Sequence, residues 1–192
     1  MNYTSFLLYM FSTAITPGPN NIAGMSNAVQ HGLKKGFIFN LGILTGQITV
    51  VYASAVFCNL LSTWVPKIEW PMRIIGAAYI LWLAWSLLRD RGDWSEVKTE
   101  PRFWPGLLLC WLNPKYYLYS IVSLQTYVLP YYSGNWKMIL FFATILVIVG
   151  FLATFFWSVF GSVFRTLFTK HAKVVNTIMA LLLVYCAVTM IL

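Results

Sequence analysis

The chain has 192 residues, of which 59% are hydrophobic and only 9% are charged, and its mean hydropathy is +0.72. This balance excludes an ordinary soluble domain, in which about a quarter of the residues are charged. The net charge of +8 could indicate nucleic-acid binding, but the basic residues are spread over short connections. We therefore expect a polytopic membrane protein that contacts membrane lipids and binds no nucleic acid.

The three cysteines indicate neither a disulfide framework nor a metal site. Cys58, Cys110 and Cys186 all fall inside apolar segments and show no CxxC or Cys/His spacing. We interpret them as small packing residues and expect no metal and no cofactor. The first apolar segment has no convincing signal-peptidase site, so we expect it to be retained as a membrane span.

Six apolar segments are long enough to cross a hydrocarbon core of ~30 Å, which needs roughly 20 helical residues. They are about Ser5–Ala28, Phe37–Leu61, Pro71–Leu88, Trp104–Leu129, Trp136–Phe160 and Val174–Leu192. Between the third and the fourth lies a polar loop of about residues 89–103. The sequence predicts an all-α integral membrane protein with one transmembrane domain over residues 1–192.

The distribution of lysine and arginine between the segments predicts the orientation. One side of the membrane has Lys34, Lys35, Arg89, Arg91, Lys98, Arg102, Arg165, Lys170 and Lys173, and the other has only Lys67, Arg73 and Lys137. By the positive-inside rule the first side is cytoplasmic, so both termini face the periplasm or exterior. The halves, about 1–88 and 104–192, then enter from opposite sides and form two inverted three-helix repeats.

Two short motifs interrupt the first and the fourth segment. The first is Thr16-Pro17-Gly18-Pro19-Asn20, and the second is Asn113-Pro114-Lys115. Each proline removes a backbone donor, so nearby carbonyls lose their usual partners. At ~1.5 Å per residue both breaks lie roughly 15–18 Å deep, near the midplane. Paired interruptions in corresponding halves are typical of a transporter's binding site.

Each break can begin a half-helix whose N-terminus binds an anion. Asn113-Pro114 and Gly18-Pro19 each read as an N-cap followed by proline at the first helical position. The free N–H groups would be those of Asn20, Asn21 and Ile22, and of Lys115, Tyr116 and Tyr117.

Lys115 supports the same hypothesis, because a cation near the bilayer centre costs roughly 2.5–3.5 kcal/mol and needs a partner. No acidic residue lies deep in a span, so a substrate carboxylate fits. The alternatives are a purely structural proline kink and a lysine that snorkels to the interface.

Other polar residues could line the same cavity. Asn40 and Gln47 are seven residues apart, hence on one helical face, and either contact substrate or make interhelical hydrogen bonds. Gly42 and Gly46 form a GxxxG pattern, which we interpret as a close helix contact. Tyr116, Tyr117 and Tyr119 follow Lys115, and at least one should face inward. We expect the side-chain oxygens of Asn20, Asn113 and Gln47 to receive the amino group.

These motifs resemble those of the LysE/RhtB family of amino-acid exporters. Thr16–Asn20 looks like the family signature, Asn113–Lys115 resembles a second motif, and the resemblance covers essentially the whole chain. Residues 77–85 and 180–188 are most similar to the cysteine and O-acetylserine exporter branch. The resemblance implies efflux of amino acids across the bacterial inner membrane, ascribed to the proton motive force, and a homodimer. The substrate-binding residues would be Thr16, Pro17, Gly18, Pro19, Asn20, Asn21, Asn40, Gln47, Asn113, Pro114, Lys115 and Tyr116.

One position departs from the family pattern and bears on the substrate. Many relatives carry an acidic residue where this chain has Gln47, which argues against carboxylate-based proton coupling. Without a deep carboxylate, lysine or arginine would leave a side-chain cation unpaired, so small neutral amino acids fit better. The alternatives are an exporter of another small solute or of cations, a scaffold or sensor, and a membrane-embedded enzyme. No paired carboxylates or HExxH motif support the enzyme, so we expect no catalytic residues.

Overall fold

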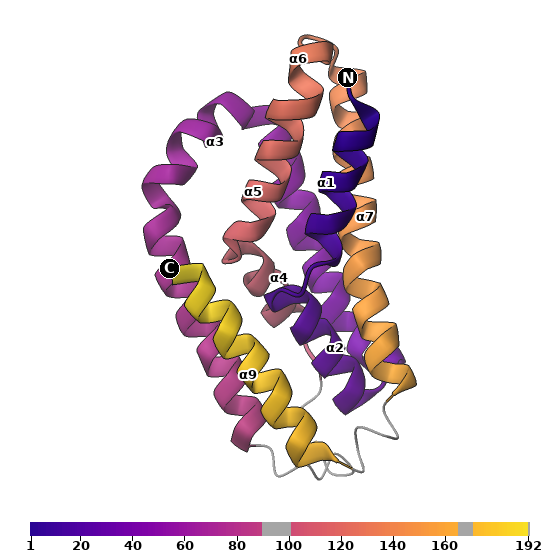
Figure 1. Cartoon of the computed structure of the whole chain (residues 1–192), viewed down its shortest axis with the longest axis vertical. Coiled ribbons are helices and arrows are strands. Elements are labelled where there is room, and N and C mark those ends of the chain that lie inside the picture. The colour runs from indigo at the N-terminus through magenta and orange to yellow at the C-terminus, as the bar shows by residue number, and fades with distance from the viewer. Residues whose placement is uncertain (90–100, 165–170, 192) are drawn as a thin grey trace.

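The computed structural model describes residues 1–89, 101–164 and 171–191, and every regular element in this part of the chain is a helix (Figure 1). The predicted all-α class is therefore confirmed. The elements are α1 (Tyr3–Ile15), α2 (Pro19–His31), α3 (Leu33–Arg89), α4 (Phe103–Trp111), α5 (Pro114–Val122), the π-helix η2 (Ser123–Val128), α6 (Leu129–Tyr132), α7 (Trp136–Val163) and α9 (Ala172–Ile191). Most of the predicted polar loop, residues 90–100, lies outside the described residues.

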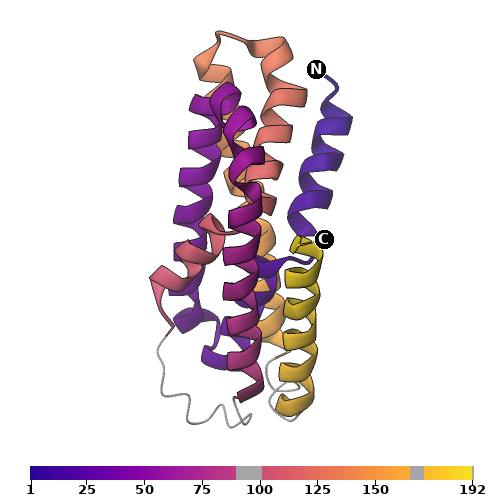
Figure 2. The ribbon, with the colours of Figure 1, turned by 90° about the vertical axis from the view of Figure 1, so that its left-hand side faces the viewer.

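The helices run along the long axis of an elongated bundle (Figures 1 and 2). In Figure 1, α1 and α2 descend from the N-terminus, α3 rises and returns, the chain from α4 to α6 rises, α7 descends and α9 rises. One end of the bundle therefore gathers the basic residues near the ends of α2, α3, α4 and α9. We call it the basic end, and its described basic residues are Lys34, Lys35, Arg89, Arg102 and Lys173.

Helix α3 (Leu33–Arg89) consists of two limbs that meet at a kink, where the sequence predicts two separate segments (Figure 1). The backbone of Phe57 is non-helical there, with φ −112° and ψ 26°. The predicted first segment ends at Leu61, whereas the kink lies at Phe57. Its first limb, Leu33–Cys58, and α7 are each long and apolar enough to cross a membrane, and the other apolar helices are shorter.

Two interruptions lie at the same level of the bundle. Helix α1 ends at Ile15 and α2 begins at Pro19 with Gly18 as its N-cap. Helix α4 ends at Trp111 and α5 begins at Pro114 with Asn113 as its N-cap. Because proline lacks a backbone N–H, both new helices begin where that donor is not needed.

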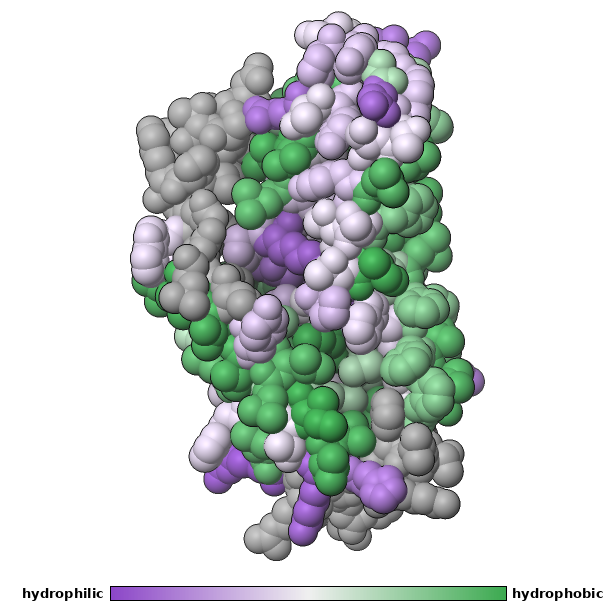
Figure 3. Space-filling model, in the orientation of Figure 1, coloured by the Kyte–Doolittle hydropathy of each residue, from purple (hydrophilic) through white to green (hydrophobic). Residues whose placement is uncertain are grey.

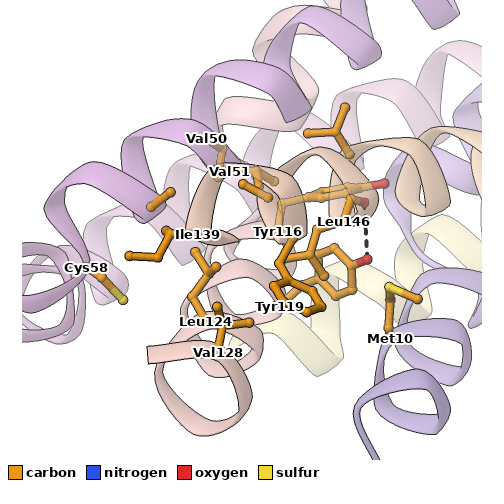
Figure 4. Close-up of a cluster of buried hydrophobic side chains, with 14 of the residues drawn as sticks. Met10, Val50, Val51, Cys58, Tyr116, Tyr119, Leu124, Val128, Ile139 and Leu146 are labelled. Atoms are coloured by element: carbon orange, nitrogen blue, oxygen red, sulfur yellow. Dashed lines mark hydrogen bonds between the residues drawn. The ribbon is translucent and has the colours of Figure 1, made fainter. Parts of the chain in front are cut away.

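The buried apolar side chains form two clusters, one on each side of this level. The cluster toward the N-terminus is drawn in Figure 4 and includes Met10, Val51, Leu124 and Leu146. The other cluster, toward the basic end, joins α2, both limbs of α3 and α9; its members include Ile22, Ile80, Met179 and Leu183. The interruptions therefore separate two packed cores.

Small residues bring α3 and α4 into close contact. A Cβ added at Gly42 would overlap the Phe103 carbonyl oxygen, and one at Gly46 would lie 2.5 Å from the Cβ of Cys110. The contact is reciprocal, because a Cβ at Gly106 of α4 would overlap the Phe39 carbonyl oxygen. The GxxxG glycines thus serve helix packing, as the sequence predicts.

We expect Gly42→Ala to destabilise the protein although alanine is the better helix former by about 1 kcal/mol. Relieving the overlap with α4 requires the two helices to separate, and such overpacking typically costs about 1–3 kcal/mol. Thermal unfolding in detergent measures the effect. Thr45→Ala is the control, because the Thr45 hydroxyl bonds only the Leu41 carbonyl of its own helix. Equal melting temperatures for the two variants would contradict the packing role.

Candidate functional site

The carbonyls that end α1 accept hydrogen bonds from side chains of other helices. The Asn21 amide nitrogen donates to the carbonyl oxygens of Ala14 at 3.0 Å and of Thr16 at 3.1 Å. The indole nitrogen of Trp157 on α7 donates to the Ile15 carbonyl at 3.1 Å. Lys115 Nζ donates to the Thr16 carbonyl at 2.9 Å. Backbone groups that the break deprives of helical partners are therefore satisfied from α2, α7 and α5.

The two half-helices that begin at the breaks are joined directly. Asn113 Oδ1 accepts from the backbone N–H of Lys115 at 3.1 Å and so caps α5. Asn113 Nδ2 donates to Asn20 Oδ1 at 3.1 Å, and both side chains are buried. Of the three side-chain oxygens expected to receive a substrate amino group, those of Asn20 and Asn113 thus already accept a hydrogen bond within the protein, whereas Gln47 Oε1 is buried without a hydrogen-bond partner. The Asn20–Asn113 bond instead holds the starts of α2 and α5 together.

A cavity of about 390 Å³ lies where the two breaks meet. Four elements contribute: the last two turns of α1, the break before α2, the start of α5 and the end of α9. Its lining residues are Tyr9, Thr13, Pro17, Gly18, Pro19, Asn113, Pro114, Lys115, Leu118, Tyr119, Tyr185 and Cys186. We call this cavity the central pocket. On the face of the molecule that is turned toward the viewer in Figure 1, Figure 3 shows a strongly hydrophilic patch near the middle, with paler and apolar surface around it.

Lys115 is the cationic residue of the central pocket. Its side chain is half-buried, and Gly18 makes room for it, since a Cβ at Gly18 would lie 3.2 Å from Lys115 Nζ. None of the described residues that line the pocket is acidic. The charge of the ammonium group is thus met by the Thr16 carbonyl, a neutral acceptor. The pocket offers a cation and a helix N-terminus to an incoming anion.

Several predicted site residues lie outside the pocket, in a buried network between helices. Gln47 Nε2 donates to the Tyr116 hydroxyl at 2.6 Å, and Asn40 Nδ2 donates to Ser158 Oγ at 2.9 Å. Thr154 Oγ1 donates to Asn21 Oδ1 at 2.9 Å. Of the two roles open for Asn40 and Gln47, the structure shows interhelical hydrogen bonding. The backbone carbonyl of Thr16 accepts the hydrogen bonds from Asn21 and Lys115 described above, whereas the Thr16 side chain is exposed.

The pocket also contains residues that the sequence did not single out. Tyr9 and Thr13 precede Thr16 by seven and three residues, so helical spacing could have placed them on the same face of α1. Leu118 follows Lys115 by three residues in the same way, and Tyr119, one of the three tyrosines considered from the sequence, also lines the pocket. Tyr185 and Cys186 come from α9, and no local motif marks them. In the part of the chain that the structure describes, no group of three or more histidine, cysteine or acidic residues could hold a metal ion.

Comparison with known proteins identifies the family. A family model described as LysE type translocator matches residues 11–192. The chain belongs to this family. LysE type translocators are membrane transporters, so this protein is a transporter and not an enzyme. No solved structure matches the chain.

Curated relatives in this family match nearly the full length. The cysteine/O-acetylserine efflux protein of Salmonella paratyphi A is 35% identical over 190 residues, 98% of this chain and 96% of that protein. The protein of the same name from Klebsiella pneumoniae subsp. pneumoniae is 34% identical over 189 residues, again 98% and 96%. The Escherichia coli O1:K1 protein of the same name is 33% identical over 187 residues, which are 96% of this chain and 95% of that protein. The resemblance to an amino-acid exporter family is thereby confirmed.

We expect Asn21→Ala to loosen the end of α1, because the Ala14 carbonyl loses this donor and the Thr16 carbonyl keeps only Lys115. Leaving buried polar groups unpaired costs about 1–3 kcal/mol. Hydrogen exchange of the backbone amides of residues 12–16, Gly18 and Asn20 should speed up, and thermal stability in detergent should fall. Asn27→Ala is the control, since the amide of Asn27 donates to the Ala23 carbonyl of its own helix. Unchanged exchange in Asn21→Ala would contradict the capping role.

Proposed function

We propose that this LysE type translocator is a secondary transporter that exports small neutral amino acids from the cytoplasm across the bacterial inner membrane. The observation that carries the proposal is the central pocket, in which Lys115 and the N-terminus of α5 lie side by side and no acidic residue lines the wall. The names of the curated relatives favour cysteine and O-acetylserine as substrates. Both molecules are small, and their side chains carry no charge.

The carboxylate of the substrate would bind at the Lys115 end of the pocket. There it would displace the Thr16 carbonyl from the ammonium group and lie near the N-terminus of α5. The N–H groups of Lys115 and Tyr116 already donate to Asn113, so α5 would contribute through its helix dipole. The start of α2 at Pro19 contributes a second helix N-terminus to the same pocket. A carboxylate would thus replace a neutral oxygen as the partner of a cation, which forms a stronger charge-assisted bond.

The substrate amino group would bind on the opposite wall of the pocket. Tyr9, Tyr119 and Tyr185 present aromatic rings, and Thr13 presents a hydroxyl group. An ammonium over a tyrosine face gains about 0.5–2 kcal/mol, which can offset its lost hydration without a carboxylate. We assign this role to the tyrosines because Asn20 and Gln47 do not line the pocket and Asn113 Oδ1 already caps α5.

In the membrane the chain would form two inverted three-helix repeats, with the breaks before α2 and α5 near the midplane. The basic end would face the cytoplasm by the positive-inside rule, which places the N-terminus outside. The lining residues Tyr9, Thr13, Leu118 and Tyr119 lie on the far side of the breaks from the basic end. This conformation would therefore present the substrate site toward the outside. Alternating access, in which helices of the two repeats part on the basic side of the breaks, would expose it to the cytoplasm.

Export of organic cations is the second candidate within the same family. It is disfavoured because the described pocket wall holds a lysine and no carboxylate, so a cationic side chain would be repelled and left unpaired. Another small anionic or zwitterionic solute would bind Lys115 and the N-terminus of α5 in the same way. It would differ from an amino acid only in how the rest of the molecule fits the pocket.

We expect Lys115→Ala to abolish transport while the protein still inserts and folds, since the carboxylate loses its cation. Lys115→Arg should retain part of the activity, and Lys35→Ala, at the basic end, is the control that removes a lysine elsewhere. Counterflow of labelled O-acetylserine in proteoliposomes measures each. The methyl ester of O-acetylserine lacks the free carboxylate, so it should fail to compete with O-acetylserine for transport by the wild type. Wild-type rates in Lys115→Ala would overturn the proposed site.

Asn20→Ala should also reduce counterflow, for a different reason. It removes the hydrogen bond that joins the starts of α2 and α5, so the pocket residues on the two half-helices are no longer held in fixed positions relative to one another. Asn20→Asp retains an acceptor for Asn113 Nδ2 and should keep more activity than Asn20→Ala. If both variants transport like the wild type, the link between the half-helices has no role in transport.

A panel of amino acids tests the substrate class. We expect cysteine, O-acetylserine, serine and homoserine to exchange, and lysine and arginine to be excluded, since no carboxylate of the described lining pairs their side chains. The same counterflow assay, run with and without a pH gradient, shows whether transport is coupled to protons. Preferential exchange of lysine or arginine would overturn the assignment to neutral amino acids.

A further inference from the structure

A second, smaller cavity lies on the basic side of the breaks. It has a volume of about 140 Å³ and is lined by Ala23, Ser26, Asn27, Gln30, Leu83, Ser86 and Leu183, which come from α2, the second limb of α3 and α9. Four of these seven side chains are polar. Gln30 Nε2 donates to Ser26 Oγ at 3.0 Å, and Asn27 Nδ2 donates to the Ala23 carbonyl at 3.2 Å. We call this cavity the inner vestibule.

The inner vestibule and the central pocket follow the same pair of helices. On α2, Pro19 lines the central pocket and Ala23, four residues later, lines the vestibule. On α9, Cys186 lines the central pocket and Leu183, three residues earlier, lines the vestibule. One helical turn rises about 5.4 Å, so the two cavities are about one turn apart on both helices. They lie in sequence along the seam between α2 and α9.

Where α2 and α9 pass from the central pocket to the vestibule, their side chains include three buried apolar ones, and two of these, Ala23 and Leu183, also line the vestibule. Ile22, Ala23 and Leu183 belong to the apolar cluster toward the basic end and are at most 4% exposed. We call these three residues the gate layer. Beyond it the vestibule reaches the basic end of the bundle, since Gln30 and Ser86 lie within three residues of the ends of α2 and α3.

The seam with α9 is a suitable place for α2 to part from its neighbours. Toward α7, α2 is bound by the Thr154–Asn21 hydrogen bond and by close packing, since a Cβ at Gly161 would lie 2.7 Å from the Met25 carbonyl oxygen. Toward α9, Ile22 and Ala23 share an apolar cluster with Met179 and Leu183. Apolar contacts are non-directional, so they re-form after a shift more easily than a hydrogen bond does.

We propose that the inner vestibule is the cytoplasmic mouth of the substrate path, and that the gate layer closes it in this conformation. The inference rests on the proposed function and adds the route by which a zwitterionic amino acid reaches Lys115. Serine hydroxyls and carboxamides both donate and accept hydrogen bonds, so the vestibule can solvate the carboxylate and the ammonium group alike. Parting of α2 and α9 by the gate layer would join the vestibule to the central pocket.

Cysteine labelling from the cytoplasmic side tests the inference. Ser26→Cys and Ser86→Cys place thiols in the vestibule, and Ser162→Cys places one at the same end of α7, outside it. A charged, membrane-impermeant thiol reagent is applied to inside-out vesicles, and uptake of labelled O-acetylserine is measured before and after. The wild type, whose Cys58, Cys110 and Cys186 are buried, gives the background.

We expect the reagent to modify both vestibule variants and to remove most of their transport, and O-acetylserine in the medium to slow the modification. Modified Ser162→Cys should keep its transport, and substrate should not protect it. The inference is overturned if the vestibule variants transport normally after full modification, or if they transport but are never modified. An unmodified wild type that moves no amino acid in this assay overturns the proposed function instead.

Discussion

Satisfying the backbone carbonyls at the end of α1 is the constraint on which the rest of this structure depends. Helix α1 stops within the bundle, and the carbonyl oxygens of Ala14, Ile15 and Thr16 need donors that the next helical turn does not supply. The donors are Asn21, Trp157 and Lys115, which belong to three different helices. The interruption therefore organises its surroundings, because α2, α5 and α7 must all be in place before α1 can end there.

The same constraint explains why packing and site are inseparable in this chain. Close packing at Gly42, Gly46 and Gly106 holds α4 against α3, so α5 begins at a defined position. From that position Asn113 bonds to Asn20 at the start of α2, and Lys115 bonds to the Thr16 carbonyl at the end of α1. The two apolar clusters then fill the bundle above and below this level without covering it. A polar level between two cores is what a path for a zwitterion requires. The central pocket lies at this level, and the inner vestibule lies on its basic side.

The sequence predicts those parts of the structure that local rules control. Proline and its neighbours mark Gly18–Pro19 and Asn113–Pro114, because a missing N–H is a property of one residue. Partners are harder to predict. Helical spacing puts Asn40 and Gln47 on one face but does not say that Ser158 and Tyr116 lie opposite. The partner of Lys115 is a backbone carbonyl, which every residue possesses. The kink at Phe57 and the π-helix over Ser123–Val128 have no glycine or proline at their positions.

The bond between Lys115 and Thr16 has a consequence for the return of an unloaded carrier. An exporter that releases its cargo must move its empty site back across the membrane, and a bare ammonium would make that step costly in an apolar interior. If the substrate carboxylate binds Lys115 as proposed, the Thr16 carbonyl, which accepts the hydrogen bond of the ammonium group in this structure, would stay bound to the charge during that step. It would then give way to the carboxylate of the next amino acid, because a carboxylate forms the stronger charge-assisted hydrogen bond.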